Sequence, residues 1–360
     1  MDYRIAVIPG DGIGVDVIRE AVRVLDRVAQ VFGHKFHYEY RLVGGCCIDA
    51  HGVPIEDETL KVCEECDAIL FGAAGGPKWD HLPRKERPES GLAALRRTFN
   101  LFCNLRPAKI YPDIKDNSPL KNEIIDKGVD LMLIRDLTGG IYFGEKGTRE
   151  GKYGIEGFDV ECYSAFEVER VARRAFEIAR GRRKSVTSID KSNALESSRM
   201  WRETVTRVHA DYPDVELNHL LVDKAAMEIA CNPSRFDVML TTSIFGDILS
   251  DEAGVTTGSV GMLASAALND KNFGLYEPIH GTAPDIAGKG IANPLASVAA
   301  VGMMLDIAFG LKEEAAAVDR AINQVLHDGY RTPDLYRGGP GQIKTTTEEM
   351  GIQTAERISR

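Results

Sequence analysis

The sequence has 360 residues, enough for a large buried core and typical of about two domains. Hydrophobic residues make up 44% and charged residues 27% of the chain, as in ordinary globular proteins. The net charge of −10 argues against a nucleic-acid partner, because an acidic surface repels phosphate backbones.

Export and membrane insertion are not expected from the sequence. Residues 1–10 lack a basic segment followed by a long apolar one, so we expect no signal peptide. The most apolar stretch, 294–310, contains Ser297 and Asp306 and is shorter than the roughly 20 apolar residues of a membrane-spanning helix. It therefore predicts a buried core helix.

The seven cysteines are scattered and odd in number, which suits a reducing compartment better than a disulfide framework. Cys63 and Cys66 form a lone CxxC, typical of a redox pair or half a zinc site. Nothing in the sequence completes a zinc site, so we expect two partly buried thiols. We expect a cytoplasmic protein.

Short apolar runs alternate along the chain with stretches of helical periodicity. The expected strands are 4–8, 67–72, 129–134, 185–189, 215–222 and 236–241. The expected helices are 18–32, 166–179 and 312–327, each followed within two residues by glycine, at Gly33, Gly181 and Gly329. This alternation predicts an α/β fold with a largely parallel sheet. The Pro- and Gly-rich segment 75–91 is expected to form a long ordered loop.

Polar residues of catalytic type follow several of the predicted strands. They are Arg135, Asp190, Lys191, Asp223 and Asp247. Ligands of open α/β sheets bind outside the carboxyl ends of the strands, so these residues are candidates for a site. For any single one, the ordinary turn to polar residues at a strand end is the more common explanation.

Asp247 and Asp251 would lie one turn apart on the same face if a helix begins near Ser243. Like charges at that spacing repel, so a divalent cation held by carboxylate oxygens is one interpretation, with Asp223 as a third ligand. The alternative is a helix cap at Asp247 and a solvated Asp251.

Arg96, Arg106 and Arg135 each border a loop or strand end, and their guanidinium groups could together bind a dicarboxylate. Singly, each such arginine is more often a surface cation. The glycines of residues 10–14 have the spacing GxGxG, not the GxGxxG of a Rossmann loop. The small residues of segment 280–294 would let backbone amides approach a phosphorylated ligand.

The chain resembles the isocitrate and isopropylmalate dehydrogenase family over its whole length. The motifs that carry this resemblance are PGDGIG (9–14), GGPKWD (75–80), NLRPAK (104–109), LTGGIYFGE (137–145), IDKSNALE (189–196), IFGDILSDE (244–252) and HGTAPDIAGKGIANP (280–294). The resemblance implies a two-domain α/β fold that is not a Rossmann fold. Residues 1–103 and 258–360 would bind the dinucleotide, and residues 104–257 would bind substrate and metal.

The resemblance also implies a homodimer that pairs through the middle domains and shares its active sites. Dimer contacts are expected near 160–180 and 223–253. The implied reaction is the NAD-dependent oxidative decarboxylation of 3-isopropylmalate in leucine biosynthesis, assisted by Mg²⁺ or Mn²⁺. Malate, tartrate and homoisocitrate are the alternative substrates. A non-catalytic regulatory subunit is a further alternative, although the expected catalytic and metal residues are all present.

Individual roles follow from the resemblance. Tyr142 would be the general acid and Lys191 the general base, a role that lowering of its pKa by burial beside cations would favour. Substrate would contact Arg96, Arg106, Arg135, Asp223 and Leu92, and the metal would be held by Asp223, Asp247 and Asp251. The dinucleotide would contact Ile13, Glu89, His280, Gly281, Thr282, Ala283, Asp285 and Asn293.

Some positions depart from the family pattern. Ser243 replaces an expected Asn, and Lys224 follows Asp223 where a neutral residue is usual. Leu92–Ala93 replaces two leucines and Ala194 a valine, which places the substrate side-chain pocket in question. Asp285–Ile286 stands where relatives that use NADP have Lys–Tyr, so the resemblance implies NAD.

Overall fold

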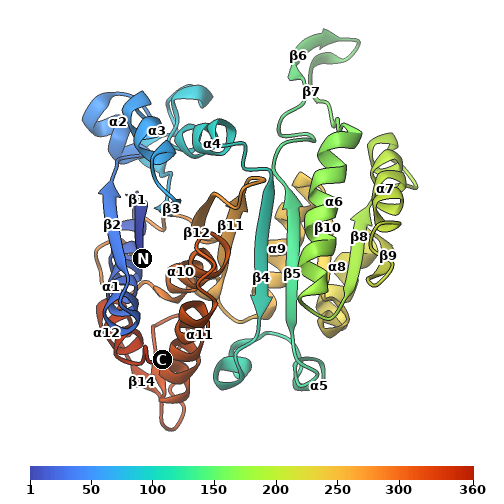
Figure 1. Ribbon diagram of the computed structural model, residues 1–360. Coiled ribbons are helices and arrows are strands. Elements are labelled where there is room, and N and C mark those ends of the chain that lie inside the picture. Colours follow the sequence, from blue (N-terminus) through green and yellow to red (C-terminus); the bar gives the residue numbers. More distant parts are fainter. The chain divides into compact units, whose positions relative to one another are not determined.

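The computed structural model describes residues 1–360, which divide into two compact units (Figure 1). Unit 1 comprises residues 1–101, 111–117 and 257–360, and unit 2 comprises 102–110 and 118–256. These limits differ slightly from the expected 1–103, 258–360 and 104–257. Residues 111–117 belong to unit 1 because Arg331 donates to the carbonyl of Asp113 at 2.7 Å and Asn117 donates to that of Leu335 at 3.0 Å.

The sheet strands of unit 1 follow the order β2-β1-β3-β12-β11. Their bounds are β1 Asp2–Gly10, β2 Lys35–Tyr40, β3 Ala68–Ala73, β11 Ala264–Leu268 and β12 Gly274–Pro278. Pairing is parallel except between β11 and β12. Every residue of β3 is buried, as expected for a continuous apolar run in a parallel sheet.

Helices pack around this sheet. They are α1 Gly14–Phe32, α2 Gly45–His51, α3 Asp57–Glu64, α4 Glu89–Thr98, α10 Leu295–Ile307, α11 Lys312–His327 and α12 Thr347–Glu356. Unit 1 also contains the 3₁₀ turns η1 Pro77–Trp79, η2 Arg84–Glu86, η3 Pro112–Asn117 and η5 Val260–Met262, and the small pair β13 Tyr330–Arg331 and β14 Ile343–Lys344. Helix α10 packs against α1, α11 and β12, which confirms the predicted core helix. Gly33 ends α1 at φ 81°, a left-handed cap that glycine adopts without strain.

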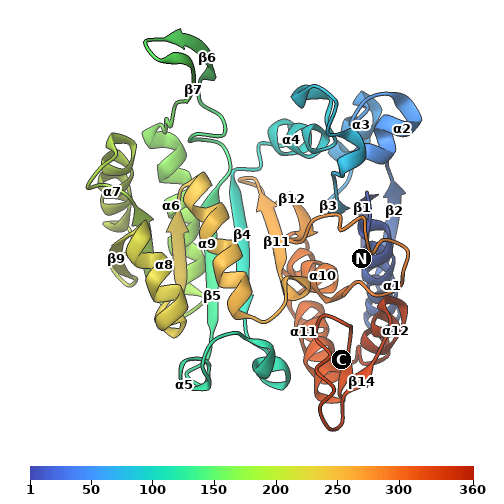
Figure 2. The ribbon, with the colours of Figure 1, turned by 180° about the vertical axis from the view of Figure 1, so that it is seen from behind.

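The sheet strands of unit 2 follow the order β4-β5-β10-β8-β9. Their bounds are β4 Cys103–Lys109, β5 Asp130–Asp136, β8 Ser185–Asp190, β9 Glu216–Leu221 and β10 Val238–Thr241. Only the β4–β5 pair is antiparallel. A separate hairpin, β6 Lys146–Gly151 and β7 Gly154–Asp159, projects from this unit (Figures 1 and 2).

The helices of unit 2 are α5 Asn122–Ile125, α6 Ala165–Arg180, α7 Glu196–His209, α8 Val222–Cys231 and α9 Ser243–Thr256, with the 3₁₀ turn η4 Pro233–Arg235. Helices α6 and α7 cover one face of the sheet, and α8 and α9 cover the opposite face (Figures 1 and 2). Helix α6 begins with a capping box in which Ser164 and Glu167 satisfy each other's backbone amides.

All the predicted strands and helices exist, with shifted ends. Val222 begins α8 instead of ending a strand. Segment 75–91 is ordered, but it contains η1 and η2, and α4 already begins at Glu89. Strand β4 escaped prediction because its sequence, CNLRPAK, lacks a continuous apolar run.

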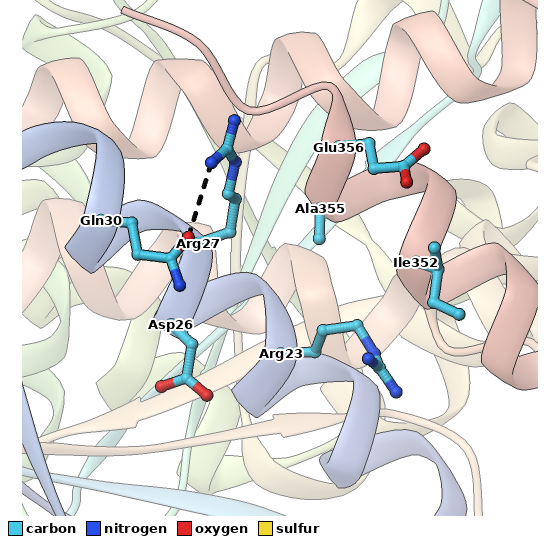
Figure 3. Close-up of a pocket in the computed structure, with 7 residues that line it drawn as sticks. All are labelled: Arg23, Asp26, Arg27, Gln30, Ile352, Ala355 and Glu356. Carbon is cyan, nitrogen blue, oxygen red and sulfur yellow. Dashed lines mark hydrogen bonds between the residues drawn. The ribbon is translucent and has the colours of Figure 1, made fainter.

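Cys63 and Cys66 are both buried, and none of the seven cysteines forms a disulfide. None of the helices has the length and apolar character needed to cross a membrane. A cavity of about 540 Å³ lies between α1 and α12, lined by Arg23, Asp26, Arg27, Gln30, Ile352, Ala355 and Glu356 (Figure 3). None of the residues assigned a role by the sequence lines it.

Candidate active site

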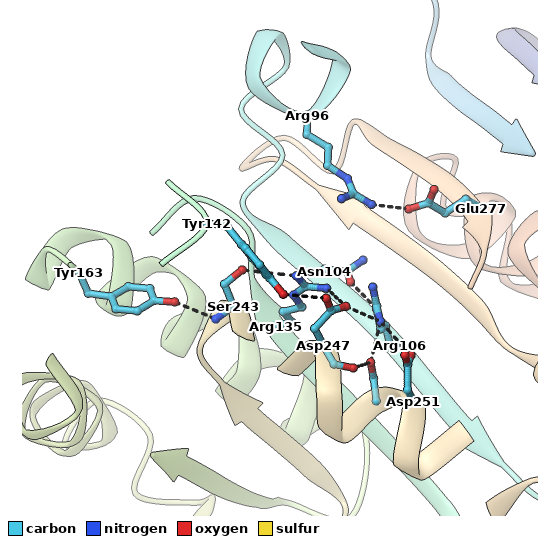
Figure 4. A network of polar contacts seen from close by, with 11 residues as sticks. Arg96, Asn104, Arg106, Arg135, Tyr142, Tyr163, Ser243, Asp247, Asp251 and Glu277 are labelled. Carbon is cyan, nitrogen blue, oxygen red and sulfur yellow. Dashed lines mark hydrogen bonds and ion pairs between the residues drawn. The ribbon is translucent and has the colours of Figure 1, made fainter. Parts of the chain in front are cut away.

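Asp247 is the centre of a polar cluster in unit 2 (Figure 4). Its Oδ1 accepts a very short hydrogen bond from Arg135 and lies 3.4 Å from Nη1 of Arg106. Its Oδ2 accepts a hydrogen bond of 3.1 Å from the hydroxyl of Tyr142. Arg106 also lies 3.8 Å from Asp251. The structure therefore brings together two of the three predicted arginines, the predicted acid and two predicted metal ligands.

The sheet and helix α9 place these side chains. Arg135 of β5 pairs with Asn104 of the neighbouring β4, and Arg106 lies two residues further along β4, so the side chains of both arginines project from the same face of the sheet. Gly246 permits close packing of α9, because a Cβ there would lie 2.8 Å from Cγ of Arg135. The side chains of Arg135 and Arg106 are only 6% and 11% exposed, so their charges act with little screening by water.

The surroundings of Tyr142 in this cluster favour its protonated form. Burial raises its pKa above 10.0, and the negative charge of Asp247 and the hydrogen bond to it raise the pKa further. The guanidinium of Arg135 lies 5.6 Å from the centre of the tyrosine ring. Tyr142 therefore carries a proton at neutral pH that it could donate to a substrate.

Helix α9 presents Asp247 and Asp251 on one face, as the i, i+4 spacing predicted. Asp247 is not a helix cap, since α9 begins one turn earlier, at Ser243. The amide of Ser243 instead donates to the hydroxyl of Tyr163 at 2.8 Å. The two aspartates offer the oxygen ligands that Mg²⁺ and Mn²⁺ prefer. No group of three His, Cys, Asp or Glu side chains within this chain could hold a metal.

Asp223 lies with Lys191, not with the other two aspartates. Lys191 follows β8, Asp223 is in the first turn of α8, and their Nζ and Oδ1 atoms are 2.5 Å apart. This contact lowers the pKa of Asp223. The neighbour of Lys191 within the chain is thus a carboxylate and not the expected cation. Asp190 is fully buried and binds Arg202, so it is not available to Lys191.

In unit 1, helix α4 places several of the predicted site residues on one face. Glu89, Leu92, Ala93 and Arg96 have i, i+3, i+4 and i+7 spacing and share this face. Arg96 donates to Glu277 of β12 at 2.8 Å, and its Nε is buried without a partner. Arg96 therefore belongs to a different cluster from Arg106 and Arg135, although all three were expected to bind one diacid.

The two predicted dinucleotide segments contact each other. The amide of Ile13 donates to the carbonyl of Thr282 at 2.8 Å. Ile13, Val17 and Ala292 form an apolar cluster onto which Ala283, Ile286 and Ala287 pack. At Gly12, where φ is +57°, a Cβ would lie 2.0 Å from the Thr282 carbonyl oxygen. The glycine of the GxGxG turn is thus required for contact between these loops.

The rest of this segment carries polar groups that are exposed or lack a partner. His280 Nε2 is buried and has no partner, and burial lowers the pKa of His280, which favours the neutral ring. Gly281 and Asp285 are exposed, whereas Thr282 is 8% and Asn293 6% exposed. An unpartnered ring nitrogen and an exposed carboxylate are groups that a base and ribose hydroxyls could satisfy.

Three further polar residues of these clusters were not predicted. Asn104 Oδ1 accepts from Arg106 Nε at 2.8 Å, and Ser250 Oγ accepts from Arg106 Nη1 at 2.6 Å. The third is Glu277, the partner of Arg96. The signal for Asn104 was its i, i+2 spacing from Arg106, which places both side chains on one face of a strand.

The structure shows the contacts of Lys224 and Ser243, two residues that depart from the family pattern. Lys224 forms an ion pair with Glu228 at 2.8 Å, one turn along α8, and so is directed away from Asp223. Ser243 Oγ is 3.5 Å from Nη2 of Arg135, a long contact. Neither residue displaces a predicted metal ligand.

Comparison with known proteins gives consistent matches. Residues 4–353 match the family model for isocitrate/isopropylmalate dehydrogenase. The chain is 54% identical over 351 residues to 3-isopropylmalate dehydrogenase of Clostridium acetobutylicum, covering 97% of this chain and 98% of that protein. It is 53% identical over 359 residues to that of Halalkalibacterium halodurans, covering 99% and 98%. The crystal structure of isocitrate dehydrogenase from Methylococcus capsulatus superposes with a TM-score of 0.87 at 32% identity, covering 99% of this chain and 100% of that one.

Proposed function

Because the chain belongs to the isocitrate/isopropylmalate dehydrogenase family, we propose that it oxidises and decarboxylates (2R,3S)-3-isopropylmalate to 4-methyl-2-oxopentanoate. The reaction is a step of leucine biosynthesis, and NAD-dependent enzymes of this kind require a divalent metal ion. The observation that carries the proposal is the cluster of Asp247 with Arg106, Arg135 and Tyr142.

The arginines of this cluster would bind and orient the diacid. In the ligand-free chain their guanidinium groups contact Asp247. A substrate carboxylate would present the same planar oxygens for paired hydrogen bonds. Binding of a cation by Asp247 would weaken its contacts with Arg106 and Arg135 and leave both guanidinium groups to the substrate. Arg106 and Arg135 would therefore bind Asp247 in the ligand-free chain and the carboxylates of the diacid in the complex.

Lys191 and Tyr142 would move the protons of the reaction. Lys191 of a second subunit would accept the C2 hydroxyl proton as the C2 hydride passes to the nicotinamide, giving a 2-keto acid. After loss of CO₂, Tyr142 would donate its proton to C3 of the enolate. A divalent cation at Asp247, Asp251 and the second subunit's Asp223 would supply positive charge where negative charge develops on substrate oxygens.

A homodimer that shares its sites is part of the proposal. Met227 of α8 and Ile248 and Val255 of α9 are 61%, 61% and 62% exposed, and a second subunit packed on these helices would cover them. On the hairpin, Tyr153 is 88% and Ile155 77% exposed, and an isolated two-stranded hairpin is marginally stable in water. These features lie within or beside the segments expected to form dimer contacts.

The substrate is tested with a panel of 2-hydroxy diacids. Leu92 is half-buried on the α4 face, and that face has no cation besides Arg96, which Glu277 already neutralises. A third carboxylate would be poorly compensated there, so an alkyl group at C3 is favoured. We expect isopropylmalate to be used well, and longer alkylmalates to be tolerated because one methylene discriminates by only about 1–3 kcal/mol. If kcat/KM for malate, tartrate or homoisocitrate exceeds that for isopropylmalate tenfold, the assignment is wrong.

We expect NAD to be preferred over NADP. Asp285 is exposed, and the neighbouring Ile286 packs onto the cluster of Ile13, Val17 and Ala292, which fixes this part of the loop. A carboxylate there would bond ribose hydroxyls and repel a 2′-phosphate. Asp285→Asn should retain NAD use and weaken the discrimination. Asp270→Asn, an exposed change in the same unit, is the control. Equal kcat/KM for both cofactors in the unaltered enzyme would contradict this assignment.

A further inference from the structure

Asp334 joins three segments of unit 1 that are distant in sequence. Its Oδ2 accepts hydrogen bonds from Ser259 Oγ at 2.5 Å and Asn293 Nδ2 at 3.1 Å. Its Oδ1 accepts from Thr332 Oγ1 at 2.5 Å. A carboxylate only accepts hydrogen bonds and has lone pairs enough for all three donors.

Asn293 is the last residue assigned to the dinucleotide, and its side-chain amide is held at both ends. Nδ2 donates to Asp334, and Oδ1 accepts the backbone amide of Leu295 at 3.0 Å, where α10 begins. Rotating the Asn293 amide by 180° would turn its Nδ2 group toward the N–H of Leu295 and its Oδ1 toward the carboxylate of Asp334, and both contacts would be unfavourable. Asp334 therefore sets the orientation of Asn293 and the entry into α10.

The surroundings leave little freedom for an alternative arrangement. Asn293 is 6% exposed, and a Cβ on Gly261 would lie 2.8 Å from its Cβ. On the preceding residue, the carbonyl of Ala292 accepts from Thr347 Oγ1 at 2.6 Å. The end of segment 280–293 is thus clamped from the C-terminal part of the chain.

We propose that Asp334 is a positioning residue for the dinucleotide, which holds Asn293 and the end of segment 280–293 in the shape that receives the cofactor. This inference rests on the proposed function, in which that segment binds NAD. Asp334 itself is not assigned any contact with the cofactor. It acts through Asn293.

The test measures NADH binding to the protein without metal or substrate, by fluorescence titration. Asp334→Ala leaves Asn293 Nδ2 without its acceptor, and loss of about one such hydrogen bond should raise the Kd about tenfold. Asp334→Asn keeps one carbonyl oxygen for Ser259 and Asn293, and the hydroxyl of Thr332 can turn to accept, so its Kd should stay within about threefold. Asp306→Ala removes an exposed carboxylate of α10 and is the control.

A double-mutant cycle distinguishes positioning from general destabilisation. If Asp334 acts through Asn293, Asp334→Ala should add little to the rise in Kd caused by Asn293→Ala. In steady-state assays the KM for NAD should rise while kcat at saturating NAD and the KM for isopropylmalate stay within about twofold.

Two results would overturn the inference alone. One is wild-type NADH affinity in Asp334→Ala, and the other is additive losses in the cycle with no rescue by Asp334→Asn. Failure of the unaltered protein to bind NADH would instead overturn the proposed function, and the inference with it.

Discussion

Replacement of Asp247 by Asn is expected to lower kcat about a thousandfold while the protein stays folded. Asp247 contacts Arg106, Arg135 and Tyr142, and it is one of two aspartates that α9 offers to a cation. Losing transition-state stabilisation of about 4 kcal/mol corresponds to a thousandfold in rate. The amide retains an oxygen that can accept from Arg135, so the fold should tolerate the change.

Two readouts separate the metal role from a structural one. Binding of Mn²⁺, followed by the electron paramagnetic resonance of the free ion, should weaken in Asp247→Asn and in Asp251→Asn. Thermal unfolding should remain one cooperative transition at a somewhat lower temperature, because Arg135 and Arg106 lose the charge of one carboxylate partner. Asp270→Asn, in an exposed turn, should leave both properties unaltered. Full activity of Asp247→Asn in the presence of a chelator would rule out the metal site.

Replacement of Lys191 by Ala is expected to reduce turnover by about 10²–10⁴-fold, the usual contribution of a general base. Lys191 contacts Asp223, and neither residue forms a hydrogen bond or ion pair with Asp247 or Asp251 of α9. In the proposed homodimer, both residues would serve the site of a second subunit. Lys127→Ala, an exposed lysine of the same unit, should retain full activity.

Subunit mixing tests whether sites are shared. A heterodimer of Lys191→Ala and Asp247→Ala chains would place both changes in one site and leave the other site intact. Purified heterodimers, isolated with two different affinity tags, should recover about half of the wild-type activity per dimer. The two mutant homodimers should remain inactive when assayed separately. Inactive heterodimers of verified composition would show that each chain completes its own site.

Local patterns in the sequence were sufficient for much of the fold. The helical spacing of residues 18–32 and the glycine after it predicted α1 and its end, because periodicity and a left-handed cap are properties of adjacent residues. The apolar composition of 294–310 likewise predicted the buried helix α10. Strand β4 was missed because a strand with polar residues and Pro107 is recognised only through its pairing with β5.

For the candidate site, the sequence by itself determined which candidate residues are present and how those within one helix are placed relative to each other. The i, i+4 spacing of Asp247 and Asp251 places both on one helix face, and the motifs identify the family. Only the tertiary structure decided which groups meet. Arg135 reaches Asp247 across 112 residues, Lys191 reaches Asp223 across 32, and Asp334 reaches Asn293 across 41. Such contacts depend on the pairing of strands and the packing of helices over the sheet, which residue spacing along the chain does not encode.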